Sequence, residues 1–263
     1  MPKRIIVFSG KKQSGKSTGA KYLFVQIFNE IMRGRQLDNH VRAEFVKSGT
    51  RHIVSIIDGN TPTHYDFDYQ NDEILKLYDT CGIRVWSFAD LLKSFCISCF
   101  GIDEMQCYGT DQDKNESIHI NWQDIANVLD LETLSIDFNS YNKKLTARQF
   151  LVLFGTHICR AIDPNCWARG LYNTIQASKY KYNLITDARF PNEVTLGTEI
   201  GAKCIRLLRD PYNGTGKDEA EVALDHFPLG EYSFVVNNKM LSIEDKNREL
   251  DTIFYQLVNN GYL

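Results

Sequence analysis

Short apolar runs alternate with longer amphipathic stretches along most of the chain. Five runs have the uninterrupted, β-branched character of strands that are buried on both faces: residues 5–8, 83–88, 182–186, 202–208 and 233–236. Between and after them, apolar positions at helical spacing predict helices over residues 17–32, 90–100, 147–162, 165–177, 192–200 and 243–259. Such alternation is typical of a parallel sheet covered by helices. The pattern therefore predicts a doubly wound α/β fold with a five-stranded, mainly parallel sheet and helices on both faces.

Two segments depart from this alternation. Residues 38–80 hold one strand-like run, 52–57, followed by the turn sequence D-G-N. We interpret this insert as a solvated hairpin on the surface rather than as a binding element. Residues 109–145 are polar and rich in turn residues, with short helical pieces expected near 122–129. Because no repeat, low-complexity tract or linker divides the chain, we predict one domain over residues 1–263.

The composition is that of an ordinary globular protein. Apolar residues make up 43% of the chain and charged residues 24%, and the formal net charge is −3. This balance gives no basic surface for a nucleic acid partner. No apolar run approaches the ~20 residues of a membrane span, and no signal peptide precedes the first strand. We therefore expect a cytoplasmic protein that binds neither membranes nor nucleic acids.

The cysteines support the same location. Seven of them are scattered along the chain, an odd number that indicates reduced thiols. Cys96 and Cys99 have C-x-x-C spacing, but they lie in an apolar stretch with helical character and no second pair at zinc-site spacing. We interpret them as residues of the core and predict no structural metal site.

The clearest chemical signal is a phosphate-binding loop near the N-terminus. Residues 10–17 read G-K-K-Q-S-G-K-S and fit the pattern G-x-x-x-x-G-K-[ST]. The loop follows the first predicted strand and opens the first predicted helix, as this motif requires. Gly10 and Gly15 permit backbone conformations that turn successive amides towards bound phosphates. Lys16 is expected to reach the β- and γ-phosphates, and the hydroxyl of Ser17 to ligate Mg²⁺.

The second half of the chain supplies further charged groups near predicted strand ends. Asp187 ends the third strand, where a second magnesium-linked carboxylate belongs in a phosphate-loop protein, although it could instead cap the next turn. Arg189 follows two residues later and would face the same crevice. Arg206 and Arg209 flank the end of the fourth strand, where one of them would stabilise charge on a transferring phosphate or both would be solvated at the surface.

Two more arginines lie on the helix predicted over residues 147–162. Arg148 and Arg160 are both candidates for a bidentate grip on an acceptor's phosphate. For Arg160, which lies near the end of that helix, capping the helix C-terminus is an equally good interpretation.

A series of short motifs extends the phosphate loop into a family pattern. In order along the chain these are F-A-D-L-L-K at 88–93, Y-G-T-D at 108–111, T-A-R at 146–148, F-G-T at 154–156, Trp167, and D-A-R-F-P-N-E at 187–193. Together with the loop they resemble the phage-type deoxynucleoside monophosphate kinases over about residues 4–240. The resemblance implies a P-loop NTPase fold and ATP-dependent transfer of phosphate to a deoxynucleoside 5′-monophosphate. It also implies a role in nucleotide supply for DNA synthesis, with Mg²⁺ as cofactor and a possible homodimer.

The resemblance assigns expected roles to residues and segments. The acceptor-binding region is expected at about 89–180 and a lid at about 209–221, where the acidic run 218–221 follows the lid. Catalytic roles are implied for Lys16, Asp187, Arg189 and Arg209. ATP is expected on Gly10, Lys11, Lys12, Gln13, Ser14, Gly15, Lys16, Ser17 and Thr18, and magnesium on Ser17 and Asp187. The acceptor is expected on Ser14, Asp90, Lys93, Arg148, Gly155, Thr156, Arg160, Trp167 and Asp187.

Some interpretations stay open at this level. Trp167 offers an aromatic face to a base or sugar, but a buried core aromatic needs no such role. The chain as a whole fits a nucleotide kinase best. Another small-molecule kinase of the same superfamily, of the phosphomevalonate or dephospho-coenzyme A type, and a non-catalytic nucleotide-binding protein are the alternatives.

Overall fold

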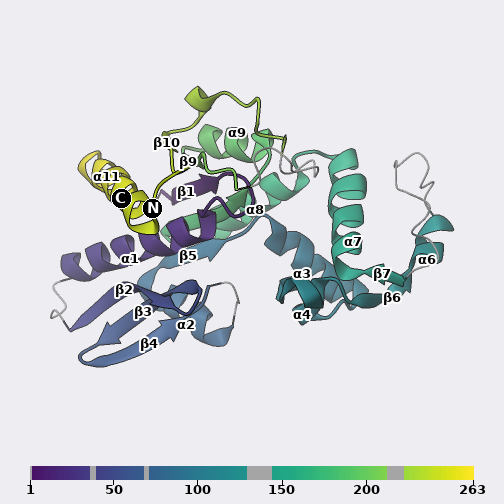
Figure 1. Cartoon of the computed structure of the whole chain (residues 1–263), viewed down its shortest axis with the longest axis horizontal. Coiled ribbons are helices and arrows are strands. Elements are labelled where there is room, and N and C mark those ends of the chain that lie inside the picture. The colour runs from purple at the N-terminus through teal and green to yellow at the C-terminus, as the bar shows by residue number, and fades with distance from the viewer. Residues whose placement is uncertain (1, 36–39, 68–70, 129–143, 212–221) are drawn as a thin grey trace. The chain divides into compact units, whose positions relative to one another are not determined.

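The chain folds into two compact units. The computed structural model describes residues 2–35, 40–67, 71–128, 144–211 and 222–263 (Figure 1). The first unit, here called the core unit, comprises Met1–Phe88 and Leu171–Leu263, and the second, here called the helical unit, comprises Ala89–Gly170. That residues 1–263 form a single P-loop kinase domain stays a prediction.

The core unit is built on a five-stranded parallel sheet in the order β10-β9-β1-β8-β5. Its strands are β1 (Arg4–Ser9), β5 (Ile83–Trp86), β8 (Tyr182–Ala188), β9 (Lys203–Leu207) and β10 (Phe234–Val236). The side chains at the centre of the sheet, such as Val7, Leu184 and Ile205, have no exposed surface. Burial on both faces explains why each strand reads as a continuous apolar run, and it confirms the predicted parallel sheet.

Helices cover both faces of this sheet. The connection through α1 (Lys16–Gly34) and the one through α9 (Pro191–Glu199) cross the sheet in opposite directions, and right-handed crossovers then place the two helices on opposite faces (Figure 1). The closing helix α11 (Ile243–Asn259) packs beside α1. Gly19 lets α1 approach β1 closely, because a Cβ there would lie 2.9 Å from the ring of Phe8.

The insert of the core unit is more than the single hairpin predicted. Strands β2 (Val41–Ser48), β3 (Arg51–Asp58) and β4 (Thr61–Tyr65) form an antiparallel sheet, and helix α2 (Asp72–Cys81) follows. Asn29 of α1 donates to the carbonyl of Ala43 and accepts from its amide, at 3.0 and 2.7 Å. Val54 at the centre of β3 has no exposed surface. The expectation of a merely solvated hairpin is therefore wrong, because one face of this three-stranded sheet packs against helix α1.

The helical unit has a hydrophobic core of its own. Its elements are α3 (Ala89–Phe100), α4 (Glu104–Tyr108), α5 (Asp111–Lys114), β6 (Ser117–Asn121), α6 (Trp122–Ala126), β7 (Lys144–Thr146), α7 (Ala147–Val152), a π-helix (Leu153–Arg160) and the start of α8 (Cys166–Ala177). Buried residues from these elements, including Cys96, Trp122, Leu145 and Phe150, form one cluster. The polar composition of residues 109–145 hid the pairing of β6 with β7, while α6 confirms the helical piece expected there.

The helix predicted over residues 147–162 is present, but its middle is a π-helix. The wider turn spans Leu153–Arg160. Within it, a Cβ on Gly155 would lie only 2.5 Å from the Leu92 side chain of α3. π-Helical segments are rare and are frequently found at functional sites. Apolar periodicity does not distinguish them from α-helix, so the sequence could not predict this one.

The two cysteines of the C-x-x-C pair differ in their surroundings. Cys96 is fully buried in the cluster of the helical unit, as the sequence predicts, whereas Cys99 is exposed. None of the seven cysteines forms a disulfide bond. Among the helices that the structure describes, none is long and apolar enough to cross a bilayer.

Candidate active site

The phosphate loop adopts a conformation that its glycines make possible. Gly10 and Gly15 have φ values of 155° and 95°, and Gln13 between them has φ 57°. A Cβ on Gly10 would lie 2.5 Å from Ser14 Oγ and 2.9 Å from the carbonyl oxygen of Leu207. The start of the loop therefore packs closely against the end of β9, where only glycine fits. Gly15 directly precedes Lys16, the first residue of α1.

Two side chains of the loop point into buried space. Lys16 is 7% exposed, and its ammonium donates to the carbonyls of Gly10 at 2.6 Å and Lys11 at 2.7 Å. Ser14 Oγ is buried and makes no hydrogen bond within the described residues. An unpaired buried hydroxyl costs free energy, so a ligand oxygen beside Ser14 would be stabilising. Ser17 is exposed and Thr18 half-buried in the first turn of α1.

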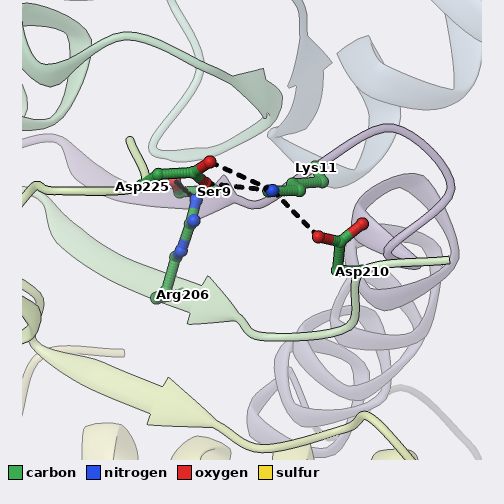
Figure 2. Close-up of polar contacts among 5 residues, drawn as sticks. All are labelled: Ser9, Lys11, Arg206, Asp210 and Asp225. Carbon is green, nitrogen blue, oxygen red and sulfur yellow. Dashed lines mark hydrogen bonds and ion pairs between the residues drawn. The ribbon is translucent and has the colours of Figure 1, made fainter. Parts of the chain in front are cut away.

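The side chain of Lys11 is held by two carboxylates that the sequence did not suggest. Its ammonium lies 2.9 Å from Asp210 Oδ2 and 3.1 Å from Asp225 Oδ1 (Figure 2). The hydrogen bond to Asp210 is the main cause that raises the pKa of Lys11. Asp210 follows β9 and Asp225 lies before β10, so the phosphate loop is tied to two points on this side of the chain.

Arg206 on β9 is a buried residue, not a solvated one. It is 6% exposed, and its guanidinium donates to Ser9 Oγ at 3.2 Å (Figure 2). The ring of Tyr232 lies 5.8 Å from the Arg206 Cζ. The surface alternative for Arg206 is therefore wrong: this cation supports the strand end from which the phosphate loop departs. Arg209 beyond β9 is exposed.

Asn238 is a site residue that sequence reasoning missed. It is 3% exposed, just after β10. Its Nδ2 donates to the carbonyl of Ser14 at 2.8 Å, and its Oδ1 accepts from the amide of Arg209 at 2.9 Å. One amide side chain therefore joins the phosphate loop to the segment after β9. Its position just beyond an apolar strand, at the carboxyl edge of a parallel sheet, was the available signal.

Asp187 near the end of β8 binds the turn that follows β5. Its Oδ2 accepts from Ser87 Oγ at 2.5 Å, and its Oδ1 accepts from the amide of Phe88 at 2.8 Å. These bonds explain why β5 ends at Trp86 and not at Phe88 as predicted. Asp187 does cap a turn, but that turn belongs to the neighbouring strand and not to its own.

The turn after β8 is capped by Glu193. Its Oε2 accepts from the amides of Arg189 at 2.7 Å and Phe190 at 3.1 Å, and the residue is 2% exposed. The hydroxyl of Tyr172 donates to the Glu193 carbonyl at 2.6 Å. The glutamate of D-A-R-F-P-N-E therefore has a structural function: it fixes the backbone of half-buried Arg189 and of Phe190.

In the helical unit, two predicted acceptor residues meet at one tyrosine. The ammonium of Lys93 lies 4.3 Å from the ring centroid of Tyr108, a cation–π distance. Burial, followed by the charge of Asp90 and a hydrogen bond to it, raises the pKa of Tyr108. Asp90, Lys93 and Tyr108 thus form one polar cluster at the start of α3.

The two arginines of the helix after β7 differ in their partners. The guanidinium of Arg148 lies 2.6 Å from Asp111 Oδ1, and both side chains are exposed. Asp111 is the last residue of the Y-G-T-D motif. Arg160 lies in the last turn of the π-helix and is half-buried. Burial raises the pKa of the Cys166 thiol, and the charge of Arg160 partly opposes that rise. The fold thus brings the T-A-R and Y-G-T-D motifs together through the Arg148–Asp111 ion pair.

Gly155, Thr156 and Trp167 lie on the π-helix and on α8. The indole nitrogen of Trp167 donates to the carbonyl of Gly155 at 2.9 Å. Gly155 is buried, whereas Thr156 and Trp167 are half-buried. The hydrogen bond fixes the tryptophan ring against the π-helix, so Trp167 has a structural partner whether or not its ring also contacts a ligand.

The predicted site residues fall into two sets. The core unit holds the phosphate loop with Lys16 and Ser17, and it holds Asp187, Arg189 and Arg209. The helical unit holds Asp90, Lys93, Arg148, Gly155, Thr156, Arg160 and Trp167. The predicted lid is described only over residues 209–211, and the acidic run 218–221 lies outside the described residues.

Comparison with known proteins identifies the family. The family model described as deoxynucleotide monophosphate kinase matches residues 4–246, which is nearly the whole chain. No curated protein matches the sequence. The matched region contains the phosphate loop, the helical unit and the D-A-R-F-P-N-E turn. The chain therefore belongs to the deoxynucleotide monophosphate kinase family and is a phosphotransferase that acts on deoxynucleotide monophosphates.

Proposed function

We propose that this enzyme uses the magnesium complex of ATP to convert deoxynucleoside 5′-monophosphates to diphosphates, with the donor bound at the phosphate loop. The observation that carries this proposal is the buried ammonium of Lys16, held inside a loop of left-handed residues at the start of α1. Backbone amides and a helix N-terminus favour a bound anion there. The buried Ser14 hydroxyl without a partner in the described residues also fits a phosphate ligand.

Lys16 has a defined function in this proposal. Its ammonium is bonded to the carbonyls of Gly10 and Lys11, and it would exchange these neutral acceptors for the β- and γ-phosphate oxygens of the donor. Hydrogen bonds between charged groups are about twice as strong as neutral ones. The exchange stabilises the charge that develops as the phosphoryl group leaves the donor.

Ser17 and Asp187 are the proposed magnesium residues. Both offer hard oxygen ligands, which Mg²⁺ prefers. When bound, the ion neutralises phosphate charge and orients the donor. The bonds from Ser87 and Phe88 hold the Asp187 carboxylate in one orientation. Arg189, whose backbone is fixed by Glu193, and exposed Arg209 are the proposed cations that stabilise the transferring group.

We propose that the helical unit supplies the acceptor site. Asp90 and Lys93 gather at Tyr108, and Gly155, Thr156, Arg160 and Trp167 lie on the π-helix and α8. Arg148 is held by exposed Asp111, and surface ion pairs of this kind contribute little to stability. Arg148 can therefore leave Asp111 for the phosphate of the acceptor, which its planar guanidinium grips through two bonds.

The decisive experiment is the Lys16→Ala variant with a panel of deoxynucleotides. We expect turnover to fall by at least a hundredfold, since loss of one such charge-stabilising contact typically costs ~3–4 kcal/mol of barrier. Lys76 is an exposed residue of α2, so Lys76→Ala is the matched control and should keep normal turnover. Near-normal turnover in Lys16→Ala would refute the proposed donor site.

We further infer that the enzyme supplies deoxynucleotides for DNA synthesis in the cytoplasm, as its resemblance to phage-type enzymes implies. A homodimer is the expected assembly. Light scattering on the purified protein tests that expectation, and a mass near 30.2 kDa would show a monomer instead.

A further inference from the structure

Lys246 on α11 is a buried lysine that the proposed mechanism does not use. It lies one turn into the helix, where its amide donates to the carbonyl of the N-cap residue Ser242 at 3.0 Å. The residue is only 4% exposed. Within the described part of the chain, its ammonium makes no hydrogen bond and no ion pair. The Nζ atom is not among the fully buried unpartnered atoms, so the stem of Lys246 is buried while its charged end keeps some solvent access.

The ammonium of Lys246 lies beside the phosphate loop. It is 3.7 Å from the point where a Cβ on Gly15 would stand, and Asn238 Nδ2 is 4.0 Å from the same point. Gly15 is the N-cap residue of α1. Lys246 and Asn238 thus converge on the loop residue at which the positive end of the α1 dipole begins.

Among the described residues, the charged group that acts on Lys246 is Arg209, which has the same sign. Burial, followed by the charge of Arg209, lowers the pKa of Lys246 to about 8. Burial is also the main cause that lowers the pKa of His52 on β3, and the charge of Lys246 contributes to it. Among the residues that the structure describes, no carboxylate contributes to the shift of the Lys246 pKa. At neutral pH this is a concentration of positive charge in low-dielectric surroundings, which an anion would neutralise.

We propose that Lys246 is a donor-binding residue, and that its ammonium binds a non-bridging oxygen of the α-phosphate of ATP. The inference rests on the proposed donor site at the phosphate loop. Lys16 and the loop amides serve the β- and γ-phosphates, whereas Lys246 reaches Gly15 from a different element. The phosphate next to the nucleoside is the anion that remains for it.

Three variants separate this function from simple packing. Lys246→Met removes the charge and keeps the aliphatic stem, Lys246→Arg keeps the charge, and Lys239→Met removes an exposed lysine of the preceding segment. We expect Lys246→Met to raise the KM for ATP and the calorimetric Kd for ADP about tenfold or more, the usual effect of one charged hydrogen bond. The KM for the deoxynucleotide should not change. Lys246→Arg should restore most of the affinity, and Lys239→Met should behave as the wild type.

Phosphorothioate donors identify the phosphate. Sulfur at a non-bridging α-position accepts hydrogen bonds poorly, so one diastereomer of ATPαS should react more slowly than ATP in the wild type. In Lys246→Met this ratio should fall close to one, because the contact is already absent. A ratio that is the same in both proteins would overturn the proposal, and so would an unchanged Kd for ADP.

The same measurements distinguish the two proposals. If Lys16→Ala abolishes turnover while Lys246→Met binds ADP normally, the donor site stands and the function of Lys246 is refuted. If neither substitution weakens ADP binding, the donor site itself is refuted. Circular dichroism of each variant checks that the fold is intact. Should Lys246→Met fail to fold, Lys246→Gln removes the charge instead, and an ADP Kd equal to that of the wild type in this variant would overturn the proposal.

Discussion

The hydroxyl of Ser87 donates to the carboxylate of Asp187 across 2.5 Å and joins the ends of two neighbouring parallel strands. The amide of Phe88 donates to the other oxygen of the same carboxylate. Two donors on separate oxygens fix the plane of the carboxylate. Asp187 is the proposed second magnesium residue, so Ser87 is a positioning residue for the metal.

Ser87→Ala should therefore weaken the binding of magnesium more than the binding of nucleotides. Loss of one hydrogen bond to a charged group costs ~1.5–3 kcal/mol, which corresponds to roughly tenfold or more in the Mg²⁺ concentration that gives half-maximal activity. The KM for the deoxynucleotide should change little. Ser94→Ala on an exposed position of α3 is the control. A magnesium titration that coincides with the wild-type curve would exclude this role for Ser87.

Arg148→Lys should raise the KM for the deoxynucleotide by roughly tenfold, the effect of ~1.4 kcal/mol. Lysine cannot reproduce the two-bond grip of a guanidinium on a phosphate. The KM for ATP should stay the same, because Arg148 belongs to the proposed acceptor set. Arg33→Lys at the exposed end of α1 is the matched control. If the KM for ATP rises and the KM for the deoxynucleotide does not, the assignment of Arg148 to the acceptor site is wrong.

Gly155→Ala should destabilise the protein by ~1–3 kcal/mol, the usual cost of overpacking. The new methyl group would lie 2.5 Å from the Leu92 side chain. Urea unfolding measures the change. Gly34→Ala is a suitable control, because a Cβ there meets no atom within 4 Å and alanine favours a helix. Equal stability of the two variants would show that α3 and the π-helix can separate without cost.

Lys246 should make the free energy of unfolding depend on pH. Its pKa is about 8 in the folded protein and 10.5 in a model peptide, so between these values the unfolded chain binds more protons. Stability must then rise with pH in this window, and the full penalty of the buried charge applies below pH 8. From pH 7 to pH 9.5 the wild type should gain about 2 kcal/mol relative to Lys246→Met. Urea unfolding of both proteins at the two pH values measures this difference. An equal change in the free energy of unfolding of the two proteins between these pH values would contradict the prediction.

Local sequence patterns were enough to predict the framework of this protein. All five strands of the parallel sheet and the helices α1, α9 and α11 were predicted, because burial on two faces or on one stripe leaves a periodic apolar pattern in the local sequence. The phosphate loop was equally visible, since its glycines, Lys16 and Ser17 are contiguous and their chemistry depends on the local backbone. The motif series of the helical unit indicated the family before any fold was known.

The residues that support this framework from distant parts of the chain could not be identified without the folded arrangement. Ser87, Asn238 and Lys246 act on Asp187, Ser14 and Gly15, which lie far from them along the chain. The π-helix likewise lies where Leu92 of α3 closely approaches Gly155, and no apolar periodicity in the sequence records that approach. Hydrophobic patterns specify which face of an element is buried, but not which polar atom of another element it will meet. Those contacts are fixed by the packing of the whole chain, where most buried polar groups find a hydrogen-bond partner.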